Sequence, residues 1–383
     1  MISLYVHIPF CASRCPYCDF ATAPATSPLR GRYLAALRAE IAREGEALGH
    51  PRIATAFFGG GTPSLLEPDE IAVLGAAIRS AFDFRPEELT FEANPATLDR
   101  ARLEAWCGLG ATRISLGAQS FSAGGLAALG RTHTVGDIAP AVAAARSVGL
   151  DVNLDLIFGR PGETDADWDV DLDAALACAP DHLSAYPLEL ERSPEEAVAN
   201  WPGDWATLAR WRAAAASAQV DDDGLARRYE RASACLAAAG LRHYEIANWA
   251  RPGKECRHNL VYWRNGEWLG VGTGAHSHLG AVRSHQPAGL LPYVLRIEGG
   301  DGRITDDGAD AAVDTAILAL RLDEGLDLAE YGLRFGDAAR ARVDRALRPL
   351  DGTGVLERRG ERVALSERGR FVASDVFVRL LPD

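Results

Sequence analysis

Strand-like apolar runs alternate with amphipathic helical stretches along the first half of the chain. Strands are predicted at Ile2–Ile8, Thr55–Phe58, Leu89–Glu92, Arg113–Gly117, Val152–Phe158 and His182–Pro187. Helices are predicted between them at Tyr33–Leu48, Glu70–Phe82, Leu98–Leu109, Val135–Val148 and Asp165–Cys178. Such repeated units favour an α/β fold with a parallel sheet covered by helices. The pattern does not distinguish an open sheet from a complete or partial barrel.

The second half of the chain has a different pattern. Residues 193–240 are charged and helical in pattern, and the tryptophans near their start are interpreted as core anchors: Trp201, Trp205 and Trp211. The composition changes near residues 299–308. Beyond that point, two helices at Ala309–Leu322 and Ala338–Leu350 and a hairpin within Val355–Arg370, turning at Arg359-Gly360, predict a small winged-helix-like unit.

Three cysteines lie close together after the first predicted strand. Cys11, Cys15 and Cys18 form a CxxxCxxC triplet, which is typical of an iron–sulfur site. A [4Fe–4S] cube held by three thiolates has a fourth iron open to a small molecule. Structural zinc is the alternative, but zinc prefers four protein ligands and His7 is the only near neighbour. The chain has seven cysteines and the other four are scattered singly, so we expect no disulfide framework and a reducing compartment.

Composition excludes several classes of function. The sequence begins without a signal-peptide pattern and contains no apolar run near the roughly 20 residues of a transmembrane helix. We therefore expect a cytoplasmic protein without a transmembrane segment. The net charge is −13, which disfavours a nucleic-acid partner because phosphate contacts need a basic surface.

Ligand-capable residues follow the ends of successive predicted strands. Gly59, Gly60 and Gly61 follow the second strand and would let backbone amides approach a ligand. Glu92, Gln119 and Asp155 lie at or near the next three strand ends. In a parallel barrel the loops after the strands form one mouth, so these residues would converge there. Each could instead be a satisfied polar core group.

Seven segments resemble the HemN-like branch of the radical S-adenosylmethionine (SAM) superfamily: YVHIPFC, GGGTPS, FEANP, GAQSF, LGRTH, NLDLIFGRPGE and HLSAYPLELE. The resemblance implies a partial (β/α)6 barrel over residues 1–240, an extension over residues 241–300 and a winged-helix-like unit over residues 301–383. It also implies one [4Fe–4S] cluster, held by Cys11, Cys15 and Cys18, and a SAM pocket. The implied SAM residues are Tyr5, Gly60, Gly61, Thr62, Glu92, Gln119, Arg131 and Asp155. Gly60, Gly61 and Thr62 would meet the SAM amine, Asp155 the ribose hydroxyls and Arg131 the carboxylate.

Two departures indicate a subgroup. Coproporphyrinogen III dehydrogenases of this branch have a further cysteine two residues after the third, where this chain has Phe20. They also have an N-terminal extension, and because the motif starts at residue 5 here, we expect this extension to be missing. The HNLVYW segment, which begins at His258, instead resembles the HemW group of heme chaperones. That resemblance implies heme binding and delivery to acceptor heme proteins, including membrane respiratory enzymes, and it leaves a homodimer open. The alternative is a radical enzyme that decarboxylates coproporphyrinogen III or methylates another substrate, so we leave open whether the chain is an enzyme.

His258 is the candidate heme ligand. Imidazole is a common axial ligand of heme iron, and Tyr262 and Trp263 lie beside His258 in the sequence. The same segment could instead pack the C-terminal region onto the barrel, with His258 hydrogen-bonded and Trp263 buried. His276, His278 and Cys256 are the other candidates for ligation.

Overall fold

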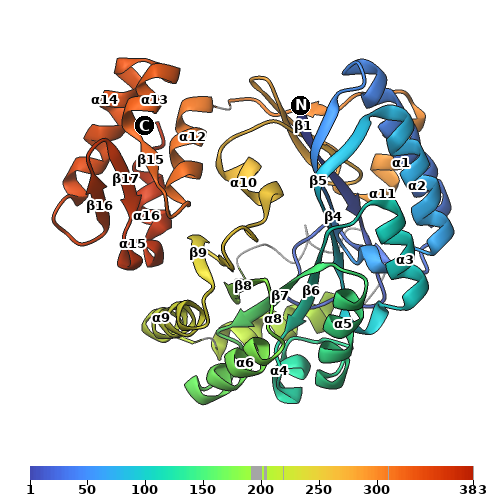
Figure 1. The fold of residues 1–383 in the computed structure, drawn as a ribbon, viewed down its shortest axis with the longest axis horizontal. Coiled ribbons are helices and arrows are strands. Elements are labelled where there is room, and N and C mark those ends of the chain that lie inside the picture. Colours follow the sequence, from blue (N-terminus) through green and yellow to red (C-terminus); the bar gives the residue numbers. More distant parts are fainter. Residues whose placement is uncertain (191–200, 202–204, 219, 309, 383) are drawn as a thin grey trace.

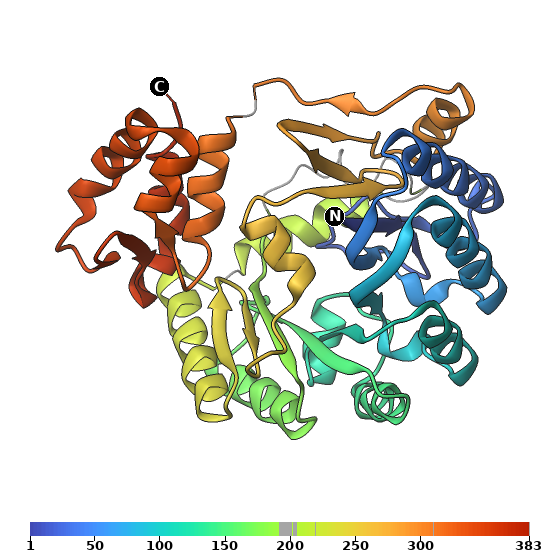
Figure 2. The ribbon, with the colours of Figure 1, turned by 45° about the horizontal axis from the view of Figure 1, so that its top comes forward.

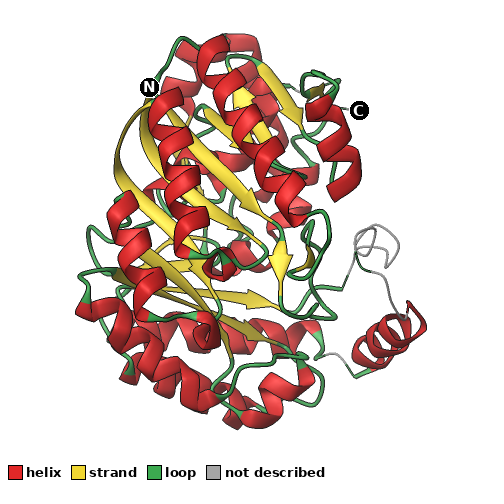
Figure 3. Cartoon of the chain, turned by 90° about the vertical axis from the view of Figure 1, so that its right-hand side faces the viewer, coloured by secondary structure: helices red, strands yellow, loops and turns green. Residues whose placement is uncertain are grey.

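A twelve-stranded mixed sheet forms the centre of the protein in the computed structural model, which describes residues 1–190, 201, 205–218, 220–308 and 310–382 (Figure 1). The strand order is β14-β13-β12-β11-β1-β4-β5-β6-β7-β8-β10-β9. Helices cover the outer side of this curved sheet, as Figure 3 shows. The described part of the chain contains no helix long and apolar enough to cross a membrane.

Six neighbouring strands of this sheet are parallel to one another: β1 Ile2–Ile8, β4 Arg52–Gly60, β5 Asp83–Ala93, β6 Arg113–Gln119, β7 Asp151–Phe158 and β8 His182–Pro187. The main helices between them are α1 Arg30–Ala47, α2 Pro68–Ala81, α3 Arg100–Leu109, α5 Val135–Ser147 and α6 Asp165–Ala177, and the short α4 Ala123–Ala128 precedes α5. The sheet pairs β1 with β11 and β8 with β10 instead of joining β1 to β8, so the barrel is open. The fold is therefore the partial (β/α)6 barrel that the family resemblance implied and that the hydrophobic pattern alone left open.

The predicted strands and helices are confirmed, with small differences at their ends. Strands β4 and β5 begin three and six residues earlier than predicted, because polar residues continue the ladder, pairing Arg52 with Asp83. Hydrophobic periodicity did not detect the extension, because the added apolar residues Ile53 and Phe84 are separated from the predicted strands by Ala54 and by the polar or proline residues 85–88.

Each parallel strand has an apolar face toward the helices and a more polar face toward the inside of the barrel. Side chains of alternate residues point outward against the helices and are fully buried, as Leu4 and Val6 are in β1. The intervening residues point into the barrel, and many of these are polar, including Glu92 in β5 and Asp155 in β7. The interior of the barrel is therefore a polar hydrogen-bonded space rather than an apolar core.

Further strands and helices extend both edges of the sheet. On the β8 edge lie α8 Trp205–Ser217, α9 Asp222–Ala238, β9 Arg242–Glu245 and β10 Asn248–Ala250. On the β1 edge lie β11 Trp268–Val271, β12 His276–Leu279, β13 Val282–His285, α11 Leu290–Glu298 and β14 Ile304–Thr305. The short helix α10, Arg257–Trp263, connects the two groups and lies on the inner side of the curved sheet (Figure 1). Part of the predicted helical segment 193–240 lies outside the described residues, as does the side chain of Trp205.

A separate hydrophobic core forms the C-terminal unit, seen at one end of the molecule in Figure 2. It comprises α12 Ala311–Leu320, β15 Leu326–Asp327, α13 Leu328–Phe335, α14 Asp337–Leu347, β16 Leu356–Arg359, β17 Arg362–Leu365, α15 Glu367–Phe371 and α16 Ala373–Val378. The two predicted helices and the hairpin are present, so the winged-helix-like prediction is confirmed. Helix α13 was not predicted, because it is only eight residues long and lies between two glycines.

Candidate functional site

The cysteine loop follows β1, at the carboxyl end of the parallel strands. Cys11 ends the short strand β2, Phe10–Cys11, which pairs with β3, Ala23–Pro24. Cys15 and Cys18 follow in a turn closed by the amide of Cys18, which donates to the Cys15 carbonyl at 3.1 Å. None of the seven cysteines forms a disulfide.

Two thiols of this loop, those of Cys11 and Cys18, are poor acids in the folded chain. Burial raises the pKa of Cys11 to about 11, although the hydroxyl of Thr62 donates to its sulfur at 3.5 Å. Burial also raises the pKa of Cys18 to about 12. These two thiols therefore keep their protons near neutral pH, until a metal ion displaces them on binding.

Two arginines supply positive charge beside the cysteines. Arg131 donates to the sulfur of Cys15 at 3.3 Å and to the Gly117 carbonyl at 3.0 Å, and Arg14 donates to the Cys18 carbonyl at 2.9 Å. The Nε atom of each arginine is also buried without a hydrogen-bond partner, and the same is true of the Nη1 atom of Arg14. A buried donor without a partner is costly. An iron–sulfur cluster held by thiolates is anionic, so a cluster in this loop would provide acceptors for these donors.

The glycine loop packs against the end of β1. Gly60 has φ +105°, and a Cβ atom there would lie 2.2 Å from the ring of His7. The amides of this loop are used inside the fold: Gly60 donates to Glu92 at 2.9 Å, Gly61 to the Ile8 carbonyl at 2.8 Å and Thr62 to the Phe10 carbonyl at 2.9 Å. The expectation that these loop amides approach a ligand is therefore wrong, because all three donate within the fold. A ligand amine would instead donate to oxygen atoms of this loop.

Two carboxyl groups lie together inside the barrel. Burial and, to a smaller extent, the charge of the nearby Asp155 raise the pKa of Glu92 to about 8. Burial also raises the pKa of Asp155. Hydrogen bonds from Ser115 at 2.9 Å and Asn153 at 2.8 Å lower this pKa, but by less than burial raises it. Two neighbouring buried carboxyl groups whose pKa values are both raised favour a cationic ligand, since a positive charge between them would stabilise both ionised forms.

Gln119 adopts an unusual backbone conformation at the end of β6. Its φ is +64°, and the register between β6 and β7 shifts just before it. A Cβ atom at Gly117 would come within 2.9 Å of the Gln119 amide nitrogen and 3.3 Å of the Arg131 guanidinium. Left-handed backbone at a residue other than glycine costs energy and is most often found at functional sites. The structure thus brings Gln119 and Arg131 together beside the cysteine loop.

Tyr5 and His7 connect this end of the barrel to a neighbouring cavity. The Tyr5 hydroxyl lies 3.0 Å from His7 Nδ1, and His7 Nε2 lies 2.9 Å from the Ala21 carbonyl. Burial lowers the pKa of His7 to about 4, so the ring is neutral, with Nε2–H donating to Ala21 and Nδ1 accepting from Tyr5. His7 was considered from the sequence only as a zinc ligand, and its neighbours here are a tyrosine and a carbonyl.

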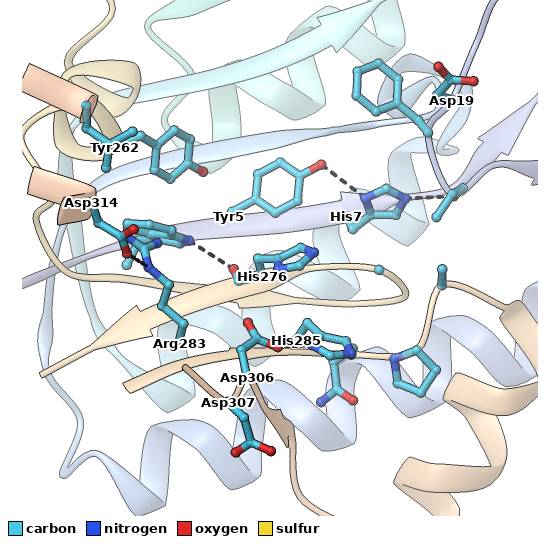
Figure 4. A pocket seen from close by; sticks show the side chains of 18 of the residues that line it. Tyr5, His7, Asp19, Tyr262, His276, Arg283, His285, Asp306, Asp307 and Asp314 are labelled. Atoms are coloured by element: carbon cyan, nitrogen blue, oxygen red, sulfur yellow. Dashed lines mark hydrogen bonds and ion pairs between the residues drawn. The ribbon is translucent and has the colours of Figure 1, made fainter. Parts of the chain in front are cut away.

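The cavity has a volume of about 1010 Å³ and lies between the barrel and the C-terminal unit (Figure 4). Its lining includes aromatic and apolar side chains, among them Tyr5, Phe20, Tyr262, Trp263, Trp268, Ile317 and Leu318. Its lining also includes ionisable groups, among them Asp19, His276, Arg283, His285, Asp306, Asp307 and Asp314. Most of these lining residues were missed from the sequence, because four separate segments of the chain, within residues 5–7, 19–21, 262–288 and 306–318, contribute them and no local motif marks them.

His258 lies inside the barrel near the amino ends of the strands, away from the cysteine loop. His258 Nδ1 lies 2.8 Å from the Thr55 hydroxyl, and His258 Nε2 lies 2.8 Å from the Tyr262 hydroxyl. The Thr55 hydroxyl itself donates to Ser3. Burial lowers the pKa of His258 to about 3, so the ring is neutral. Both ring nitrogens are hydrogen-bonded within the fold, which favours the packing interpretation of HNLVYW.

Glu88 holds the start of α10 in this position. Its carboxylate accepts from the amide of His258 at 2.9 Å and from that of Arg257 at 3.0 Å, and the thiol of Cys256 lies 3.5 Å away. A carboxylate at a helix N-terminus satisfies amides that have no partner within the helix. This end of the barrel is therefore closed by α10. His278, another candidate, is buried, and its Nδ1 lies 2.9 Å from the Gly266 carbonyl.

Comparisons with known proteins agree with this architecture. The model of the Radical SAM superfamily matches residues 5–175, and that of the HemN C-terminal domain matches residues 306–372. A solved structure of Escherichia coli coproporphyrinogen III oxidase (HemN), described as a radical SAM enzyme, has the same fold: the TM-score is 0.84 at 22% identity, over 99% of this chain and 89% of that chain. The fold and the cysteine loop therefore define a radical SAM protein.

Similarity over the full length identifies the family. The chain is 40% identical to the heme chaperone HemW of Mycobacterium tuberculosis over 389 residues, covering 99% of this chain and 94% of that protein. It is 29% identical to the heme chaperone HemW of Bacillus subtilis, over 98% of both chains. The chain belongs to the HemW family.

Proposed function

We propose that this protein is a cytoplasmic heme chaperone that binds one [4Fe–4S] cluster, SAM and heme, and that passes the heme to acceptor heme proteins. The observation that carries the proposal is the end-to-end similarity to proteins named heme chaperone HemW. The cavity beside the barrel adds a physical reason, because it is at the upper end of the volumes of ligand pockets and its lining includes large aromatic side chains.

The residues of the cysteine loop suit the cluster. Cys11, Cys15 and Cys18 would provide three thiolates, and Arg14 and Arg131 would donate to the anionic group that these thiolates hold. When bound with SAM, such a cluster supplies an electron for reductive cleavage of the sulfonium.

The residues inside the barrel suit SAM. Its sulfonium is a cation, which the pair Glu92 and Asp155 favours, and Asp155 is also an acceptor for ribose hydroxyls. Oxygen atoms of the segment Gly60–Thr62 would receive the methionyl amine, and Arg131 would offset the carboxylate. Gln119, held beside Arg131, would line the same pocket, and Tyr5 would separate it from the cavity.

Heme would occupy the cavity, whose rim includes Phe20. This side chain is 64% exposed, and it stands where the dehydrogenases of the branch have a further cysteine. An exposed aromatic ring at a cavity offers an apolar surface to a porphyrin.

Heme binding can be tested with a charge placed at that rim. Phe20→Glu should weaken heme binding at least tenfold in a hemin titration followed at the Soret band. The matched control is Val170→Glu, which adds the same charge at an exposed apolar residue of α6 that does not line the cavity. Equal affinities in the two variants would place heme elsewhere.

Delivery can be tested by mixing heme-loaded protein with an apo heme protein at increasing concentration. A chaperone that hands heme over in a complex gives a transfer rate that increases with acceptor concentration until it saturates. A rate independent of the acceptor at all concentrations would mean that heme is first released to solvent, which contradicts the proposal. A parallel anaerobic assay with reductant, SAM and coproporphyrinogen III tests the alternative, because formation of protoporphyrinogen would establish dehydrogenase activity.

A further inference from the structure

Three antiparallel strands at the far edge of the sheet bring two histidines and an aspartate together. His276 begins β12 and His285 ends β13, and the two are direct partners in the strand ladder. Their rings lie side by side, with centroids 5.4 Å apart and planes at 32°. Asp306 directly follows β14, which pairs with the end of β13. The backbone ladder therefore fixes where all three side chains start.

The ligand-capable atoms of these three residues converge. One nitrogen of each imidazole and one carboxylate oxygen all lie within 4.8 Å of one another, and His285 Nδ1 is 2.5 Å from Asp306 Oδ1. Two imidazoles and a carboxylate are a donor set that divalent transition metals favour. A zinc ion with bonds of about 2.0–2.2 Å holds its ligands roughly 3.3–3.5 Å apart. Small side-chain rotations would close the remaining distance while the strands stay in place.

The surroundings favour a cation. Figure 4 shows the group at the wall of the cavity, with Asp307 close to Asp306. Arg283, on the same strand as His285, is engaged with Asp314 at 2.7 Å.

A porphyrin iron fits this group less well than a free ion does. Two axial imidazoles of one heme lie on opposite faces of the porphyrin, whereas His276 and His285 project side by side from neighbouring strands of one sheet. A small ion can bind both rings and the carboxylate at once.

We infer that His276, His285 and Asp306 form a binding site for a divalent transition-metal ion, separate from the cysteine loop. Three protein ligands leave at least one coordination position, which would face the cavity and accept water or an anionic group. The inference goes beyond the proposed heme function and does not depend on it, since it rests on side chains that would bind the ion in the absence of heme.

The site is tested by calorimetric titration with Zn²⁺ under anaerobic conditions, using protein whose cysteine loop is filled with its cluster and which contains no heme. We expect one zinc ion per chain, and at least tenfold weaker binding in each of His276→Ala, His285→Gln and Asp306→Asn. The glutamine variant keeps a hydrogen-bonding group beside Asp306 and so protects the fold. Asp307→Asn and His50→Ala are the matched controls, and both should bind zinc within about twofold of the unchanged protein.

Zinc X-ray absorption on the same samples identifies the ligands. Nitrogen and oxygen scatterers at about 2.0–2.1 Å, without sulfur, are expected. A sulfur shell near 2.3 Å, zinc affinity unchanged in all three ligand variants, or no saturable zinc binding would each overturn the inference. In separately prepared heme-loaded protein, a Soret band that shifts in His285→Gln while zinc binding is kept would also overturn the inference, because His285 would then bind heme iron instead. A protein that binds zinc at these residues but fails the hemin titration would leave the metal site standing and remove the proposed heme function.

Discussion

At the amino end of the barrel the polar side chains bond to one another, whereas at the carboxyl end several of them do not have partners. His258 is neutral and bonded through both ring nitrogens, and Glu88 receives two helix amides. Around the cysteine loop, Arg14 and Arg131 have buried donors without acceptors, and Glu92 lies beside a second carboxyl group. Polar groups that are all hydrogen-bonded to one another stabilise a fold, whereas buried charged groups that do not have partners indicate a ligand-binding site.

The largest expected effect distinguishes Cys15 from cysteines outside the loop. Cys15→Ser should remove the brown absorbance and most of the bound iron after anaerobic reconstitution, because one of three thiolate ligands is lost. Cys107→Ser, at a half-buried helical cysteine in α3, is the matched control and should keep its iron. Four irons per chain in Cys15→Ser would contradict the assignment of the cluster to this loop.

The next effect is a pH dependence of stability that comes from Glu92. Its pKa is about 8 in the folded protein against an ordinary 4.5, so the folded state binds this proton more tightly than the unfolded state does. The contribution to the free energy of unfolding is complete below about pH 4.5 and is lost as the pH rises to about 8, by at most about 1.4 kcal/mol per pH unit. Glu92→Gln should not show this loss.

Urea unfolding of cluster-free protein without SAM, followed between pH 5 and pH 8.5, measures the effect. As the pH rises, the free energy of unfolding of the unchanged protein should fall relative to that of Glu92→Gln. A difference independent of pH would mean that Glu92 titrates normally and would remove the argument for a cationic ligand beside it.

A smaller effect is expected at Asp155. Asp155→Ala should weaken SAM binding roughly tenfold or more in a calorimetric titration, since losing a charged acceptor costs about 1.5–3 kcal/mol. Asp173→Ala, at an exposed aspartate on α6, is the control. A thermal melt of both variants separates lost binding from lost folding, because Asp155 also accepts from Ser115 and Asn153. Unchanged SAM affinity would exclude Asp155 from the pocket.

The smallest effect tests the amino end of the barrel. His258→Ala should lower the free energy of unfolding by about 1–3 kcal/mol, the range of a lost buried hydrogen bond, and leave the cluster and SAM binding intact. Tyr262→Phe removes only one of the two bonds to the ring and should cost less. With heme bound, the Soret band of His258→Ala should not move. A moved band with unchanged stability would make His258 a heme ligand and would overturn the contrast between the two ends.

The parts of the molecule that sequence predicted are those in which the signal is local. The alternation within β1 and the spacing of Cys11, Cys15 and Cys18 lie within 20 residues, so strand, loop and cluster motif could be recognised together. Glu92 and Asp155 could be placed at one mouth because parallel strands share a direction.

The parts that were missed depend on contacts between distant segments. The closure of the amino end of the barrel by α10 depends on Glu88, which is 170 residues away from His258 in the sequence. The group of His276, His285 and Asp306 arises from the register of β12, β13 and β14, which hydrophobic periodicity does not determine.

The central claim is that the carboxyl end of the barrel binds SAM at a cluster with an open iron. The most direct test is electron paramagnetic resonance of the reduced, reconstituted protein, recorded before and after addition of saturating SAM. We predict a [4Fe–4S] signal whose g values change when SAM is added, and the absence of that signal in Cys15→Ser. Spectra that are identical with and without SAM, in protein with a full cluster, would contradict the claim.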